Sequence, residues 1–272
     1  MMRFVKAHAC GNDFLLVEEN AAGKEHAEMA RALCARNTGI GADGIEFIER
    51  RAGGEFFLRL FNADGGEAEL SGNGTRCVAA WLAESEGLME VALGTHGGMR
   101  PCRIVEARSP VFRIESGMGV PRVMPRTIEL PTVGEIAGAM VNVGNPHFVV
   151  FVESADFSVH GRPWQEVGER ISTSPLFKHG TNVEFVQLAA AGEIEFRIFE
   201  RGCGPTMSSG TGTCASAAAA MMLRGAERSL VAMAEGGAQS VMWPRNDEPM
   251  LLTGAAEIVC TGETMSWPKG VR

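Results

Sequence analysis

Residues 71–77 read SGNGTRC and residues 209–214 read SGTGTC, 138 positions further along a chain of 272 residues. The same shift places IEFI (45–48) on VEFV (183–186), LRLF (58–61) on FRIF (196–199), and Gly87 on Gly225. A gap-free register over about forty residues indicates an internal duplication. The sequence therefore predicts two domains of similar size, each with a glycine-rich loop that opens a helix.

The pattern of apolar residues predicts a mixed α/β (α+β) fold. Alternating or β-branched runs bounded by glycine indicate strands, and runs rich in Ala, Met and Leu indicate helices. In each of two pseudo-symmetric domains, strands are expected to form a barrel-like wrap around one central helix, which ends at Gly87 or Gly225. The expected strands are 14–17, 45–48, 56–61, 139–143, 148–152, 183–186, 194–199 and 241–243, and the expected helices are 27–35, 74–84, 164–171 and 212–223.

Domain boundaries are predicted from the proline pattern. Residues 121–134 contain three prolines and are expected to form a linker. The N-terminal domain is then 1–120, joined by a C-terminal strand at about 262–272, and the C-terminal domain is 121–261. One site is expected in a cleft between the two like halves.

Composition excludes several classes of function. The net charge of −8 argues against binding to a phosphate backbone, so no nucleic acid partner is expected. No apolar run approaches the length of a signal-peptide core or a membrane span, so a cytoplasmic protein without a membrane partner is expected. The seven cysteines lack CxxC spacing, which argues against a disulfide framework and against a thiolate zinc site. No metal site is predicted.

Residues 39–44 read GIGADG and match the dinucleotide-binding pattern G-x-G-x-x-G. That pattern requires a strand before the loop and a helix after it. Here the predicted helix 27–35 precedes the loop and the predicted strand 45–48 follows it. A structural turn is therefore expected instead of a nucleotide site.

The duplicated loops are the first candidate for chemistry. The N–H groups at a helix start, together with the positive end of the helix dipole, attract anions. Two such helix ends could hold one carboxylate and stabilise negative charge that develops on an adjacent carbon. Ser71 and Ser209 also suit a plain structural role, because serine is among the best N-cap residues. The duplication favours a functional site.

Polar residues in short glycine-flanked segments are the second candidate. Asparagine in such segments is usually a turn former, yet amides at several strand ends also suit a pocket for a zwitterion. His147 and Glu200 are candidates for acid–base or orienting roles, although a single histidine is more often structural. The asparagines are Asn12, Asn62, Asn145 and Asn182, and Arg201 follows Glu200.

These segments together resemble the diaminopimelate epimerase family. The resemblance implies two pseudo-symmetric α/β domains and no cofactor. It also implies interconversion of the LL and meso forms of diaminopimelate, a small amino-acid substrate of lysine and peptidoglycan precursor biosynthesis, and it allows a homodimer. The matching segments occur in the family's order: HACGNDF (8–14), RNTGIGADG (36–44), FNADG (61–65), GNPH (144–147), GTNVEF (180–185), ERG (200–202) and LTGAAE (252–257).

The resemblance also implies site residues. The family moves the α-proton with two cysteines, and Ser71 and Ser209 stand at the matching positions. His147 and Glu200 would tune or orient these two bases. Backbone groups of Gly72, Asn73, Gly210 and Thr211 would hold the α-carboxylate, and the rest of the substrate would contact Asn12, Asn62, Asn145, Asn182, Glu200 and Arg201.

The exchange of both thiols for hydroxyls has a chemical consequence. A helix N-terminus brings a cysteine pKa into a useful range, whereas a serine hydroxyl stays un-ionised and is a poor base without a neighbouring histidine. Little or no epimerisation is expected from the chain as written, with binding retained. Smaller departures are Gly44 for a usual Gln, Cys10 for Leu and Cys203 for Val. Neither cysteine is expected to replace a catalytic thiol, because neither is predicted at a helix N-terminus.

Two other functions stay open at this stage. One is an isomerase or tautomerase of an unsaturated carboxylate on the same fold, since a more acidic carbon needs a weaker base. The other is a non-catalytic amino-acid-binding relative. Retention of the pattern around Ser71 and Ser209 favours an epimerase of diaminopimelate that has lost its two thiols.

Overall fold

The computed structural model describes residues 1–265 and divides into two compact units. Unit 1 is Met1–Ser116 with the chain from Gly254 onward, and unit 2 is Gly117–Thr253. The chain therefore changes unit at 116/117 and 253/254, whereas the sequence analysis placed these boundaries at 120/121 and 261/262. Strand β17 (Leu251–Thr264) explains the second difference, because it is one continuous strand that passes from unit 2 into unit 1. Most of the expected closing strand at about 262–272 lies outside the described residues.

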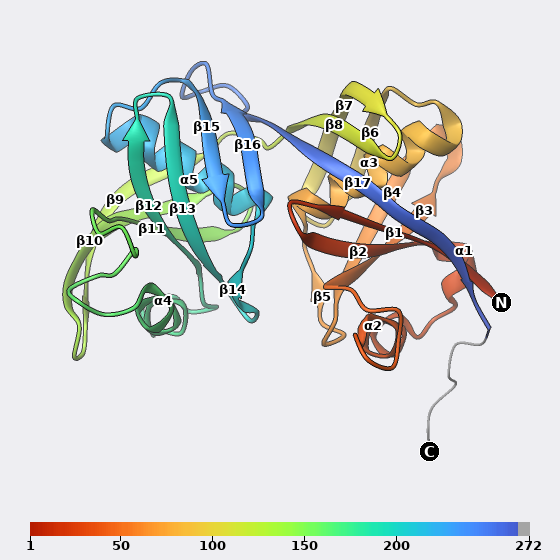
Figure 1. Cartoon of the computed structure of the whole chain (residues 1–272), viewed down its shortest axis with the longest axis horizontal. Coiled ribbons are helices and arrows are strands. Elements are labelled where there is room, and N and C mark those ends of the chain that lie inside the picture. Colours follow the sequence, from red (N-terminus) through yellow and green to blue (C-terminus); the bar gives the residue numbers. More distant parts are fainter. Residues whose placement is uncertain (266–272) are drawn as a thin grey trace. The chain divides into compact units, whose positions relative to one another are not determined.

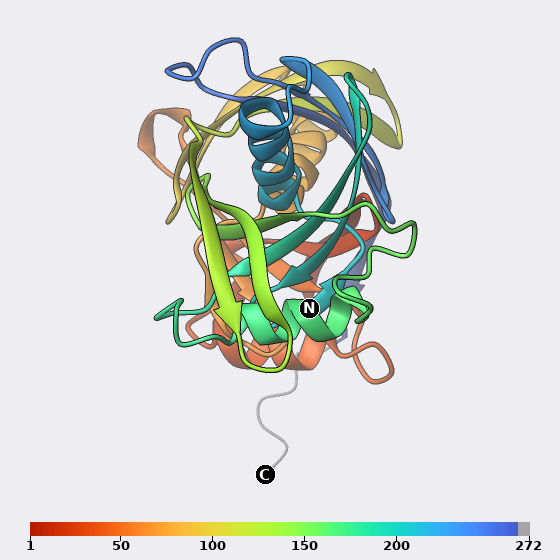
Figure 2. The ribbon, with the colours of Figure 1, turned by 90° about the vertical axis from the view of Figure 1, so that its left-hand side faces the viewer.

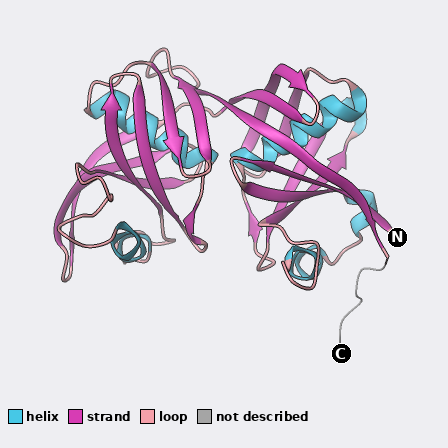
Figure 3. Cartoon of the chain, viewed as in Figure 1, coloured by secondary structure: helices cyan, strands magenta, loops and turns pink. Residues whose placement is uncertain are grey.

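Unit 1 is a ring of eight strands closed by β17 (Figures 1 and 3). Each strand pairs with the next, and β17 pairs with the first and the last of the other seven. In order around the ring, the other strands are β1 (Met2–Ala9), β2 (Asn12–Glu18), β3 (Gly44–Arg50), β4 (Phe56–Asn62), β6 (Glu90–Thr95), β7 (Gly98–Arg108) and β8 (Val111–Gly117); the short β5 (Glu67–Ala68) pairs with β4.

Helices supply the crossovers that the parallel pairs of unit 1 require. Strands β2 and β3 are parallel, as are β4 and β6, and parallel neighbours need a long connection. Helices α1 (Glu19–Ala22) and α2 (His26–Cys34) connect the first pair, and α3 (Gly72–Glu86) connects the second. A 3₁₀ turn, Ala52–Gly54, joins β3 to β4. Helix α3 lies among the strands and forms their common core (Figure 3).

Unit 2 repeats this arrangement with its own strands, and the expected duplication and fold class are confirmed. Strands β11 and β12 are a parallel pair, as are β13 and β15, and α4 (Trp164–Ser172) and α5 (Gly210–Leu223) provide the two crossovers. Figure 2 shows α5 surrounded by strands and α4 on the outside. The strands are β9 (Arg122–Leu130), β10 (Gly134–Asn142), β11 (Pro146–Phe151), β12 (Asn182–Ala190), β13 (Glu193–Glu200), β14 (Gly204–Thr206), β15 (Ser229–Ala234), β16 (Gly237–Met242) and the first part of β17.

Enclosure explains the composition of the central helices. Residues 210–221 of helix α5 are all buried, and its alanines from Ala217 to Ala220 are completely buried. A helix that is buried all round needs no polar face, and small side chains let the strands approach it closely. No helix within residues 1–265 is long and apolar enough to cross a membrane.

The expected linker at residues 121–134 is wrong, because most of it forms β9. This strand pairs with β10 along its whole length, and Ile128 and Leu130 are buried in the same cluster as helix α4. In the described chain, β9 is paired along its length with β10 on one side. Pro125 is tolerated because an edge strand can lack one N–H donor. Proline density alone therefore did not distinguish a linker from an edge strand.

The ends of the central helices match the sequence prediction. Gly87 caps α3 in the left-handed conformation, with φ of +71°, and Gly225 follows α5 with φ of +70°. A Cβ at either position would meet no atom within 4 Å. Glycine is therefore needed here for its backbone conformation and not for space.

We expect Gly87→Ala to lower the free energy of unfolding by about 1 kcal/mol, because alanine is strained in the left-handed conformation. Gly87→Asn should cost clearly less, since asparagine tolerates this conformation. Urea unfolding followed by circular dichroism measures both. Equal losses for the two variants would show that the backbone conformation is not the cause.

Candidate functional site

Each central helix begins at one of the two serines. Ser71 is the N-cap of α3, and its Oγ accepts a hydrogen bond of 3.0 Å from the N–H of Gly74. Ser209 is the N-cap of α5, and its Oγ accepts one of 3.3 Å from the N–H of Gly212. The cap role is thus confirmed for both serines. It does not compete with a second role, because a serine oxygen can accept a further hydrogen bond and donate its own proton.

The first turn of each central helix is enclosed by its unit. In α3, Gly72 and Asn73 are buried, and Asn73 is only 1% exposed. In α5, Gly210 and Thr211 are buried as well. The positive ends of two helices therefore lie in surroundings of low dielectric constant, where their attraction for a carboxylate is strongest.

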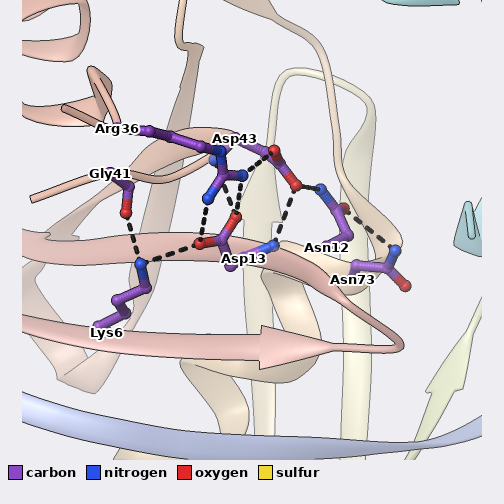
Figure 4. A network of polar contacts seen from close by, with 7 residues as sticks. All are labelled: Lys6, Asn12, Asp13, Arg36, Gly41, Asp43 and Asn73. Atoms are coloured by element: carbon purple, nitrogen blue, oxygen red, sulfur yellow. Dashed lines mark hydrogen bonds and ion pairs between the residues drawn. The ribbon is translucent and has the colours of Figure 1, made fainter. Parts of the chain in front are cut away.

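The amide side chains of Asn12 and Asn73 form a chain of hydrogen bonds with Asp43 (Figure 4). Arg76, which is completely buried, donates through Nη2 to Oδ1 of Asn73 at 2.5 Å. Asn73 Nδ2 in turn donates to Oδ1 of Asn12 at 3.1 Å, and Asn12 Nδ2 donates to Asp43 Oδ2 at 2.7 Å. Because arginine only donates and a carboxylate only accepts, the two ends of the chain fix the orientation of both amides.

Charged groups hold the far end of this chain. Arg36 contacts Asp13 at 2.9 Å and Asp43 at 2.7 Å, and Lys6 Nζ lies 3.0 Å from Asp13 (Figure 4). Burial of Asp13 opposes its ionisation, but Arg36 and Lys6 outweigh that effect and hold the pKa of Asp13 below its ordinary value. Asp13 therefore stays charged and anchors the loop that carries Asn12.

Glu46 is a buried carboxylic acid that the sequence analysis did not select. It lies in β3, is 1% exposed, and has its pKa raised by burial to about 8. Its Oε1 is so close to α3 that a Cβ on Gly74 would lie 2.0 Å from it. A carboxylic acid with such a pKa is largely protonated at neutral pH, so it can donate a proton at the start of this helix.

Unit 2 places an imidazole where unit 1 has none. His147 contacts Glu184 Oε1 through Nδ1 at 2.6 Å and Asn145 Oδ1 through Nε2 at 2.9 Å. Burial raises the pKa of Glu184, and His147 counteracts this effect. Asn145 also donates to Thr211 Oγ1 at 3.3 Å, which links this group to the first turn of α5. Both ring nitrogens of His147 are engaged within the protein, which fits an orienting role.

Glu200 also lies beside Ser209. Its Oε1 accepts a hydrogen bond from Thr206 Oγ1 at 2.5 Å. Enclosure of the carboxyl group raises the pKa of Glu200, whereas hydrogen bonds from Thr206 and Ser209 and the nearby His147 lower it. The structure thus brings three of the predicted residues, Ser209, His147 and Glu200, into one group within unit 2.

The remaining predicted residues lie at strand ends. Asn182 begins β12, and its Oδ1 accepts a hydrogen bond of 2.9 Å from the backbone N–H of Arg201, whose side chain is exposed. Asn62 ends β4 and closes a turn through its backbone, which accepts from the N–H of Gly65 at 2.8 Å. Asn62 is half-buried, as Asn12 and Asn145 are, whereas Arg201 is exposed.

Burial disfavours ionisation of three cysteines. Burial raises the pKa of Cys34 to about 12, and it also raises the pKa of Cys77 and Cys102. Cys10 and Cys203 lie in the turns after β1 and β13, and neither is the N-cap or a first-turn residue of a helix. As expected, GIGADG (39–44) is a turn between α2 and β3, and a Cβ on its first glycine would lie 2.3 Å from the carbonyl oxygen of Ala32.

The sequence was compared with proteins of known family. A family model described as diaminopimelate epimerase matches residues 4–124 and 139–259, one match for each repeat. The chain belongs to the diaminopimelate epimerase family. The protein named diaminopimelate epimerase 1 from Nostoc sp. is 35% identical over 96% of this chain and 99% of its own length. Diaminopimelate epimerase from Parabacteroides distasonis is 34% identical over 96% and 97%.

Solved structures share the fold at low sequence identity. A hydroxyproline epimerase from Agrobacterium vitis superimposes with a TM-score of 0.74 at 15% identity, over 96% of this chain and 90% of that one. A PhzF-family phenazine biosynthesis protein from Bacillus anthracis gives a TM-score of 0.72 at 17% identity, over 97% and 99%. A methylitaconate-delta-isomerase gives 0.64 at 12% identity, over 96% and 94%. The diaminopimelate epimerase fold is thus common to several isomerases.

Sequence reasoning missed Glu46, Glu184 and Arg76 in this member of the diaminopimelate epimerase family. The two glutamates occupy equivalent places in the duplicated runs IEFI and VEFV, where a charged residue interrupts an otherwise apolar strand. That interruption was the available signal, because a carboxylate within a buried strand is rare unless it is paired or functional. Arg76 was not selected because the sequence did not indicate that helix α3 is buried on all sides.

We expect the unfolding free energy to fall as pH rises from about 5 to about 8, because folded Glu46 keeps a proton that the unfolded chain releases. The contribution of Glu46 is up to about 1.4 kcal/mol per pH unit within this window. Subtracting the unfolding free energy of Glu46→Gln from that of the unaltered chain at each pH isolates the contribution of Glu46. Glu49→Gln, on the exposed end of the same strand, is the control. Parallel curves for the chain and Glu46→Gln would contradict the assignment.

Proposed function

We propose that the chain binds diaminopimelate and interconverts its LL and meso forms without a cofactor, at a low rate. The observation that carries this proposal is the pair of serines that begin the central helices of the two repeats in a member of the diaminopimelate epimerase family. By resemblance, Ser71 and Ser209 occupy the two acid–base positions. The proposal includes a cytoplasmic role in lysine and peptidoglycan precursor biosynthesis.

The low rate follows from the surroundings of the serines. Each Oγ accepts a hydrogen bond from a backbone N–H, at 3.0 Å for Ser71 and 3.3 Å for Ser209. Such a bond and the helix dipole stabilise a negative oxygen, yet an un-ionised hydroxyl remains too weak a base for an α-proton. A cysteine at the same place would benefit from the same dipole and become a thiolate.

Substrate binding has support of its own. The buried first turns of α3 and α5 suit the α-carboxylate at the reacting centre, and the fixed amides of Asn12 and Asn73 supply oriented polar groups. On this proposal, His147 orients Asn145 and Glu184, and Glu200 tunes Ser209. The roles of Asn62, Asn182 and Arg201 as contacts to the distal part of the substrate are carried from the family.

A second candidate is an isomerase of an unsaturated carboxylate. It is favoured by the weak bases at both serines, because a carbon between a carboxylate and a double bond loses its proton more readily. One protein of the same fold is named methylitaconate-delta-isomerase, but at 12% identity this neighbour bears on the fold alone. A non-catalytic amino-acid-binding role would leave tight binding without any proton exchange.

We expect the double variant Ser71→Cys/Ser209→Cys to exchange the α-proton of LL-diaminopimelate in heavy water about 100-fold faster than the chain as written, because a positioned base contributes about that factor or more. NMR of the substrate follows the exchange and the appearance of the meso form. Ser208→Cys, which adds a thiol one residue before the N-cap, is the control and should not accelerate exchange.

Two outcomes would contradict the proposal. If neither the chain nor the double variant exchanges the proton, diaminopimelate is not the substrate, and unsaturated carboxylates are screened next. If the unaltered chain exchanges as fast as the double variant, the serines do not limit the reaction.

A further inference from the structure

Glu46 lies on the face of β3 that is turned toward the central helix. Side chains alternate along a strand, and Ile45 and Phe47 pack in the cluster of α2, whereas Ile48 packs in the cluster of α3. Glu46 shares the face of Ile48. Its carboxyl group therefore lies inside the ring of unit 1, at the start of α3.

The contact with α3 is unusually close and depends on a glycine. A Cβ on Gly74 would lie 2.0 Å from Glu46 Oε1 and 2.9 Å from its Cδ. The N–H of this same glycine donates to Ser71 Oγ at 3.0 Å. The Glu46 carboxyl group and the Ser71 hydroxyl thus converge on one residue in the first turn of the helix.

Unit 2 has the same construction with a different partner. A Cβ on Gly212 would lie 3.0 Å from Glu184 Oε1 and 3.2 Å from Ser209 Cβ, so carboxyl and serine converge there too. Glu184, however, is bonded to His147, whereas the residue equivalent to His147 in the duplicated register is Ala9. Burial is the cause that raises the pKa of Glu46, with no offsetting charge or hydrogen bond. A carboxyl group kept in such a place without compensation calls for a role beyond packing.

We propose that Glu46 exchanges protons with the side chain at position 71 and so serves the first acid–base position as its proton reservoir. This inference rests on the proposed function, because it supplies the ionisable group that Ser71 lacks. Glu46 acts through residue 71 and is a positioning residue in this sense, not a group that touches the substrate.

The proton balance is simple in both directions. When the α-carbon is protonated, the Ser71 hydroxyl gives its proton to the carbanion while neutral Glu46 gives its own proton to Ser71 Oγ, and Glu46 ends as a carboxylate. In the reverse direction, the C–H bond breaks, its electron pair stays on the carbon, and its proton goes to Ser71 Oγ. The proton that Oγ already carried passes at the same time to the Glu46 carboxylate, so that Ser71 ends as a neutral hydroxyl and Glu46 as a neutral acid. No oxidation or reduction is involved.

Other titratable and charged groups adjoin this position and must be included in any pH analysis. The pKa of Cys77, further along α3, is influenced by neighbours from four places in unit 1. These are Arg76 on α3, Glu46 on β3, Cys10 in the β1–β2 turn and Asp13 on β2. Arg76 lowers the pKa of Cys77 and so opposes the effect of burial on that thiol. Cys77, Arg76, Cys10 and Asp13 are present in all variants below, so differences between variants report on Glu46.

The first test uses Ser71→Cys, in which the new thiol reports on its surroundings without any substrate. Alkylation by iodoacetamide is measured from about pH 6 to about pH 10 by mass spectrometry of the peptide that contains position 71. If Glu46 ionises beside the thiol, adding Glu46→Gln should lower the midpoint of thiol ionisation by about one pH unit, because a neighbouring negative charge is removed. Alkylation below that midpoint should then be about tenfold faster, and the thiol should titrate in a single step. Glu49→Gln is the control and should leave the curve unchanged.

The second test measures α-proton exchange of diaminopimelate by the double variant Ser71→Cys/Ser209→Cys. Adding Glu46→Gln should reduce the exchange rate by about tenfold or more and remove one limb of its pH profile, and Glu46→Asp should restore part of both. Circular dichroism of each variant verifies folding.

The two tests fail in different ways. Identical thiol titrations with Glu46 and with glutamine at that position would overturn the inference. The inference would also be overturned if Glu46→Gln shifts the thiol titration but leaves the pH profile of α-proton exchange unchanged. Absence of exchange in every variant would overturn the proposed function instead. The thiol titration would then still decide whether Glu46 and position 71 share protons.

Discussion

The enclosure of one helix by strands is the constraint on which each unit depends. A helix start has N–H groups without intrahelical acceptors, and inside a ring of strands water cannot satisfy all of them. Serine N-caps resolve part of this problem, and the glycines of the first turn let neighbouring groups approach the backbone closely. The same features that make the enclosed helix stable also create an electropositive, dry position beside a hydroxyl. The enclosure of the central helix therefore accounts both for the packing of each unit and for the electropositive position beside its serine.

Duplication preserved this backbone and changed the ionisable groups around it. In the duplicated register, Ala9, Gly44 and Asn62 of unit 1 correspond to His147, Asn182 and Glu200 of unit 2. Unit 2 consequently has an imidazole and two carboxyl groups near its serine, whereas in unit 1 the carboxyl group of Glu46 lies against Gly74 in the first turn of α3. Each unit thus carries a different proton chemistry on the same frame. An enzyme that moves a proton between two faces of one carbon needs one protonated and one unprotonated group at any moment, because one side must donate while the other accepts.

In the polar network of unit 1, charged side chains orient the amides near the start of α3 through other residues and not by direct contact. Asp13 and Asp43 are held by Arg36 and Lys6, and through them Asn12 and Asn73 have fixed amide orientations. Arg76 closes the other end of the chain from inside the ring. A replacement of any member would alter the presentation of the helix start without changing the helix itself. This is a common way in which residues remote from a reacting atom tune it.

The sequence alone determined the duplication, the central helices with their serine and glycine ends, and the family, because these follow from local rules: a repeat register, capping preferences and motif order. It also placed the asparagines at strand ends correctly. It failed for residues 121–134, where prolines resembled a linker but pairing with β10 made a strand, since pairing partners lie outside the local sequence. Only the tertiary structure decided the ring closure by β17, the pairing of His147 with Glu184, and the position of Glu46 against Gly74. These depend on which face of a strand meets which turn of a helix, and that is a property of packing that no single segment contains.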